Sequence, residues 1–146
     1  MNTNSGPAVA PINRNRVVWC GLAAGLIVNA FEYGIHGSYL DEAWTAAFRA
    51  LGKTPTGWSA FIPANFFIGI LLVWLYARLR PTCGRGPKTA LRSGLATWVV
   101  FWVIPLMAIM PMGLFPIGLL AAAIALGVVD VGLAALLGAW LYEERS

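Results

Sequence analysis

An acidic residue and the only histidine of the chain lie four residues apart in a stretch that is otherwise mostly apolar. The stretch is GLIVNAFEYGIHG, residues 25–37, and it contains Asn29, Glu32 and His36. On a helix, a spacing of four places Glu32 beside His36, within reach of a carboxylate–imidazolium hydrogen bond. Glu32 either bonds to His36 in this way or carries a proton itself. Such a pair can hold a proton, an ion or a small ligand, or it can only join two helices.

Two glycines extend the same helix face toward the N-terminus. Gly21 and Gly25 continue the spacing of the polar residues, with intervals of 4, 4, 3 and 4 from residue 21 to residue 36. All five side-chain positions therefore fall within one narrow sector of a helix. Small residues at such intervals let a second helix backbone approach closely. We predict that this face points into a helix bundle, with the glycines as packing positions.

Two further polar residues lie at matching depths in other apolar stretches. At ~1.5 Å per residue, Asn29 and Asp130 come out roughly 18 Å from the cytoplasmic ends of their helices, and Glu32 and Asn65 about 21 to 23 Å. A carboxylate inside a membrane costs about 2.5 to 3.5 kcal/mol on insertion scales, so it needs a partner, a proton or water. We expect one polar intramembrane cluster of Asn29, Glu32, His36, Asn65 and Asp130.

The chemistry of this predicted cluster is open between packing and function. Hydrogen bonds that fix the register of helices explain it, and so does a site for a ligand, an ion or a transferable proton. A metal site lacks a second histidine or a nearby cysteine, so we expect neither a metal nor a cofactor. No Ser/His/Asp or Cys/His arrangement indicates an enzyme, and no catalytic residue is assigned. Cys20 and Cys83 are expected to remain free thiols.

The composition indicates a membrane protein. Of the 146 residues, 59% are hydrophobic and 11% are charged, which would leave a soluble domain of this size with too much apolar surface. The net charge of +4 does not indicate nucleic-acid binding, because the basic residues flank apolar runs instead of alternating with aromatic residues. The lipid bilayer is therefore the expected partner.

Four apolar runs are long enough to cross a bilayer as helices. They predict an all-α polytopic membrane protein with one four-helix transmembrane domain, residues 17–146, after a disordered cytoplasmic tail, residues 1–16. Pro63 falls in a first helical turn, where a missing N–H costs little. The predicted spans are residues 17–36, 60–79, 93–112 and 117–142.

Between the first two spans, residues 39–51 predict an amphipathic helix. Apolar residues recur there at helical spacing, with charged residues on the opposite face. Ser38 has the position of an N-cap, and Gly52 supplies a stop. We expect this helix to lie in the outer membrane–water interface, as a lid on the bundle or as a docking surface for another protein.

The distribution of basic residues predicts the orientation. Eight of the ten Lys and Arg residues flank the predicted cytoplasmic ends of the spans, against Arg49 and Lys53 on the other side. Both termini should therefore be cytoplasmic. We interpret the seven tryptophans, including Trp19, Trp44, Trp58, Trp74, Trp98 and Trp102, as ordinary anchoring and packing residues, most of them near the predicted membrane interfaces.

Two segments carry a resemblance to known proteins. In GLAAGLIVNAFEYGIHGSYLDEAWTAAFRALG and in VVDVGLAALLGAWLY, the chain resembles small four-helix bacterial membrane proteins classed as domains of unknown function. The resemblance lies in a first helix interrupted by polar residues, an amphipathic segment with a tryptophan and a closing helix rich in small residues. It implies a location in the bacterial inner membrane and carries no activity.

Two main functional hypotheses follow from the sequence, and an intramembrane enzyme is a third, less favoured one. The first is a non-enzymatic integral membrane protein, either an accessory or structural subunit of a larger membrane complex or a small bundle with a polar pocket. The second is a small transporter or proton-handling unit centred on Glu32, His36 and Asp130. Four spans enclose little volume, so the second hypothesis favours a homo-oligomer.

Overall fold

The computed structural model describes residues 12–142, which are helical with no β-strand among them. Four helical stretches are long and apolar enough to cross a membrane: Arg14–Tyr39, Trp58–Cys83, Pro87–Met112 and Ile117–Leu141. The prediction of an all-α protein with four spans and one additional amphipathic helix is confirmed. The elements are α1 (Arg14–Gly34), η1 (Ile35–Tyr39), α2 (Asp41–Ala50), η2 (Trp58–Ala60), α3 (Phe61–Cys83), α4 (Pro87–Trp98), η3 (Val99–Val103), α5 (Ile104–Ile109), η4 (Met110–Met112) and α6 (Ile117–Leu141).

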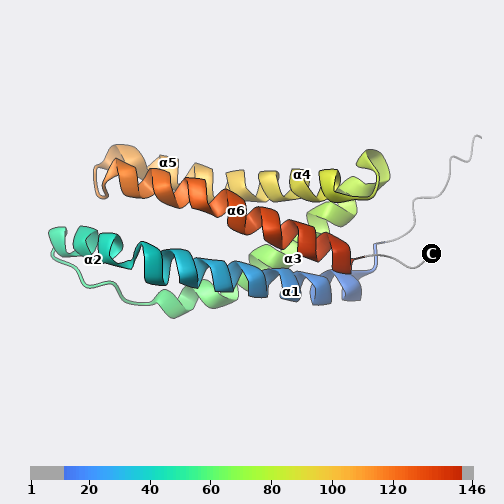
Figure 1. Ribbon diagram of the computed structural model, residues 1–146, viewed down its shortest axis with the longest axis horizontal. Coiled ribbons are helices and arrows are strands. Elements are labelled where there is room, and N and C mark those ends of the chain that lie inside the picture. Colours follow the sequence, from blue (N-terminus) through green and yellow to red (C-terminus); the bar gives the residue numbers. More distant parts are fainter. Residues whose placement is uncertain (1–11, 143–146) are drawn as a thin grey trace, which may run out of the picture.

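The helices form two pairs that meet along α6. Figure 1 shows α1 beside α3 and, opposite them, α6 beside the continuous stretch of α4 and α5. The contact between α1 and α3 is the most extensive, and α6 also contacts α1 and α3. The fourth span, α6, therefore lies against all three others, and its residues face the centre of the bundle.

Glycines make the contact between α1 and α3 unusually close. Gly21 and Gly25 lie against α3, and a methyl group added at Gly69 would collide with the backbone of both. A methyl group at Gly21 would in turn meet the Cα atom of Ile70. The absence of side chains at these positions lets the two backbones touch, as small residues do in membrane helix pairs.

The amphipathic helix α2 packs on the start of α6. Its buried residues Trp44 and Ala47 join Leu40 in a hydrophobic cluster with Leu119 and Leu120 of α6. The rings of Trp44 and Phe115 also form a T-shaped pair, with 5.5 Å between ring centroids. The apolar face of α2 is thus used for contact with the bundle, and its charged face points away.

Several helix boundaries differ from those expected from the sequence. The first helix begins at Arg14 because Asn13 caps it, its side-chain oxygen accepting a hydrogen bond from the Arg16 amide at 3.1 Å. Residues 14–16 are therefore helical, while residues 1–11 of the expected tail lie outside the described residues. Ser38 does not cap α2, because the first span continues through the π-helical turn η1 to Tyr39. The third span begins at Pro87, which suits a first helical turn.

Candidate functional site

Glu32 occupies the centre of a polar group between three helical stretches. Its Oε1 atom accepts a hydrogen bond from the indole Nε1 of Trp102, at 3.3 Å. The Nε2 atom of His36 lies 3.5 Å from the same oxygen. Glu32 is therefore held by one residue of its own helical stretch and one of the third span.

His36 connects this group to the amphipathic helix. Its Nδ1 atom accepts a hydrogen bond from the indole Nε1 of Trp44 at 2.9 Å. An accepting Nδ1 carries no hydrogen, so the ring proton of this neutral form is on Nε2, which faces Glu32. A second proton on the ring would displace the Trp44 indole. The arrangement therefore links the protonation of His36 to its contact with α2.

Both partners of Glu32 lie in π-helical turns. His36 belongs to η1 and Trp102 to η3. In the third span, Pro105 has no N–H to bond with the Phe101 carbonyl, and the widened turn before it ends where the Ile104 amide bonds to the Val99 carbonyl. Single π-helical turns occur often at functional sites, because they re-aim a side chain without ending the helix. Here the turn presents Trp102 to Glu32.

Asp130 of α6 is the most deeply buried charged residue among those described. Its side chain is 0% exposed, and neither carboxylate oxygen has a hydrogen-bond partner in residues 12–142. The carboxyl group interacts electrostatically with that of Glu32. One helical turn away, Gly127 leaves room for the indole ring of Trp102. Asp130 is thus more deeply buried than Glu32, whose side chain is 18% exposed.

Asn29 and Asn65 form a second polar group, which joins α1 to α3. The side-chain amide of Asn65 donates to Asn29 Oδ1 at 3.3 Å, and that of Asn29 donates to the carbonyl oxygens of Gly25 and Ile62. Hydrogen bonds of this kind hold two helices, here α1 and α3, in register. No hydrogen bond connects this group to Glu32, His36 or Asp130 among the described residues.

Three of the tryptophans form hydrogen bonds with residues of other helical elements. Trp44 and Trp102 donate to His36 and Glu32, and Trp98 donates to the carbonyl oxygen of Ile124 at 2.8 Å. Composition alone cannot separate these residues from membrane-interface tryptophans. Pro105 is the one signal for Trp102, because a proline inside a span requires a local change of the helix.

Buried hydroxyl groups line α4, and they were not expected from the sequence. Ser93 bonds to the carbonyl oxygen of Ala90, and Thr97 bonds to that of Ser93. Thr89, at the start of the helix, bonds to the carbonyl oxygens of Cys83 and Gly84. All three are therefore satisfied by the backbone, unlike Asp130.

No group of three His, Cys, Asp or Glu side chains within residues 12–142 lies close enough together to hold a metal ion. Cys20 and Cys83 are both free thiols. No protein family, curated protein or solved structure matches the chain. The geometry around Glu32 and Asp130 is therefore the basis for a functional proposal.

Proposed function

We propose that this integral membrane protein handles protons, through Asp130, Glu32 and His36. The observation that carries the proposal is the fully buried Asp130 carboxyl group, whose two oxygens have no hydrogen-bond partner among residues 12–142. A bare carboxylate in such a place is expensive, so the group must bind a proton or a cation to remain there. Polar residues that only join helices are expected to pair with each other, as Asn29 and Asn65 do.

Glu32 and His36 supply a route by which this proton exchanges. The side chains of Glu32 and His36 are 18% and 15% exposed, whereas that of Asp130 is fully buried. A proton therefore reaches Asp130 through Glu32, and Glu32 exchanges it with His36, whose Nε2 lies 3.5 Å away. Carboxyl and imidazole groups are common members of proton relays inside membrane proteins.

We further propose the orientation and location that the sequence indicates. Eight of the ten basic residues flank one side, which supports cytoplasmic termini and places Glu32 and His36 in the outer half of the membrane. The bacterial inner membrane is proposed only from the pattern of the sequence, since no family model matches the chain. On this orientation, the proton enters from the outer side.

A second candidate function is that of an accessory subunit in a homo-oligomer or a larger membrane complex. It is favoured by the third span, in which 11% of the apolar membrane-spanning part is buried, against 44% in the fourth span. That span has most of its surface available for lipid or for another chain. The two functions are compatible, because the surface of the third span and the buried site are separate.

Proton flux in vesicles tests the proposal. The purified protein is reconstituted into liposomes that enclose a pH-sensitive dye, and an imposed pH gradient is followed over time. We expect the gradient to collapse faster than in empty liposomes, Asp130→Asn to abolish that difference, and Thr97→Val to keep it. If wild-type protein is no faster than empty liposomes, or if Asp130→Asn is as fast as wild type, proton transport across the membrane through Asp130 is excluded and the subunit function stands alone.

A further inference from the structure

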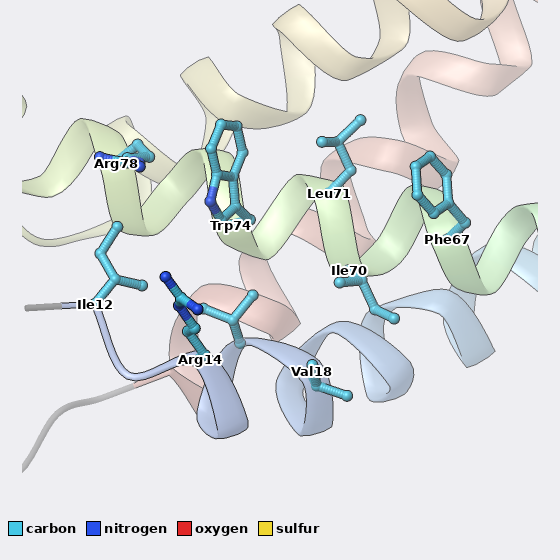
Figure 2. Close-up of a pocket in the computed structure, with 9 residues that line it drawn as sticks. Ile12, Arg14, Val18, Phe67, Ile70, Leu71, Trp74 and Arg78 are labelled. Carbon is cyan, nitrogen blue, oxygen red and sulfur yellow. The ribbon is translucent and has the colours of Figure 1, made fainter.

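A groove between the beginning of α1 and the cytoplasmic half of α3 has a volume of about 560 Å³. Figure 2 shows Arg14 and Arg78 at one end of it, Phe67 at the other, and Val18 and Ile70 between them. The groove is on the outside of the helix pair, away from Glu32 and Asp130. It therefore has no part in the proposed proton site.

The charged end of the groove is positive. Arg14 and Arg78 are exposed, and neither forms an ion pair with an acidic residue in the described part of the chain. The guanidinium of Arg78 lies over the ring of Trp74, 5.3 Å from its centroid. Trp and Arg together are typical of the headgroup level of a membrane, where the indole ring sits at the interface and the guanidinium meets phosphate.

The apolar part of the groove has the length of one membrane leaflet. Phe67 precedes Arg78 by eleven residues on α3, which corresponds to roughly 16 Å along the helix axis. Half of the hydrocarbon core of a bilayer measures about 15 Å. An acyl chain that begins at the level of Arg78 therefore ends near Phe67, after passing the side chains of Leu71 and Ile70.

We propose that this groove binds one anionic phospholipid from the leaflet that Arg14 and Arg78 face. Its phosphate lies between the two guanidinium groups, and one acyl chain lies along Val18, Ile70 and Leu71. Charge complementarity selects an anionic headgroup, and the apolar floor selects a lipid over a free phosphate. Under the proposed orientation, this is the cytoplasmic leaflet.

Lipid binding to the purified, delipidated full-length protein tests the proposal by native mass spectrometry. Phosphatidylglycerol and phosphatidylcholine are titrated separately, and we expect tighter binding of phosphatidylglycerol. The double variant Arg14→Gln, Arg78→Gln should weaken that binding by about 25-fold, since each arginine near a membrane surface contributes about fivefold. The matched control is Arg85→Gln, Arg92→Gln, which removes two basic residues outside the groove and should change binding less than twofold.

A second variant tests the apolar half while both arginines remain. Val18→Trp fills the groove at an exposed position and should weaken phosphatidylglycerol binding at least fivefold without lowering the melting temperature. Equal losses in the two double variants would overturn the proposal, because they would indicate attraction by diffuse charge. Equal binding of the two lipids by the wild-type protein, or unchanged binding by Val18→Trp, would also overturn it.

Discussion

Asp130 differs from the other buried polar residues of the bundle in what its oxygen atoms contact. The hydroxyl groups of Ser93 and Thr97 bond to backbone carbonyls of their own helix, and Asn65 bonds to Asn29. The Asp130 carboxyl group has no such partner among the described residues. A buried polar group without a partner costs about 1 to 3 kcal/mol, so Asp130 is there at the expense of stability.

This difference predicts opposite effects of two leucine substitutions on stability. Asp130→Leu should leave the melting temperature unchanged or raise it, because an unpartnered polar group is replaced by an apolar one. Asn65→Leu should lower stability by about 1 kcal/mol, because it removes the hydrogen bond to Asn29. Thermal unfolding in detergent micelles measures both. A larger loss for Asp130→Leu than for Asn65→Leu would mean that Asp130 is a structural residue.

At the scale of elements, the two π-helical turns determine what surrounds Glu32. A regular helix through residues 99–105 would turn the indole of Trp102 to a different direction, since every residue advances the helix by about 100°. Pro105 prevents the regular hydrogen-bond pattern there. The position of Trp102 therefore depends on Pro105, although Pro105 forms none of the described hydrogen bonds to Glu32.

We predict that Pro105→Ala weakens the bond between Trp102 and Glu32. Alanine restores the N–H that a regular helix needs at this position. The third span can then form regular α-helical hydrogen bonds in place of the π-helical turn. The indole ¹⁵N–¹H resonance of Trp102 in micelles should move toward that of a Glu32→Gln variant. Pro63→Ala, in the first turn of α3, is the matched control and should leave that resonance in place. An unshifted Trp102 resonance in Pro105→Ala would show that the turn has another origin.

The contact between α1 and α3 predicts a large effect of one methyl group. Gly69→Ala should destabilise the protein by about 1 to 3 kcal/mol, the usual cost of overpacking, because the new methyl group meets the backbone of Gly21 and Gly25. Gly118→Ala is the control, because nothing lies within 4 Å of its added methyl group. Unfolding in detergent compares them. Equal stability of the two variants would contradict the close approach of the helices.

The elements were predictable from the sequence to a greater extent than the site. The lengths of the apolar runs predict the four spans, and the helical spacing of Gly21, Glu32 and His36 predicts that they share one helix face. The hydrogen-bond partners of Glu32 and His36 were harder to predict, because the bonds from Trp44 and Trp102 depend on how separate helices pack together. The predicted N-cap at Ser38 is wrong because the first span continues past it to Tyr39. This continuation is compatible with the packing of α2 on α6, and such packing between separate helices is not visible in the local sequence.

At the scale of the whole molecule, α2 links the buried site to one end of the bundle, which is the outer end in the proposed orientation. It packs on α6 through Trp44 and Ala47, and the same Trp44 donates a hydrogen bond to His36. In our proposal a proton that arrives at His36 displaces the Trp44 indole, and Glu32 then passes a proton to Asp130. The lid, the relay and the buried acceptor are thus parts of one route from the outer side.

The most direct test of this route is the carboxyl signal of Asp130 itself. Infrared difference spectra are recorded on reconstituted protein after a pH step on the outer side, with ¹³C-labelled aspartate to separate its band from that of glutamate. We predict a protonated-carboxyl band that is absent in Asp130→Asn and that responds to the outer pH more slowly in Glu32→Gln. A band that persists in Asp130→Asn, or one that never responds to outer pH, would contradict the proposal.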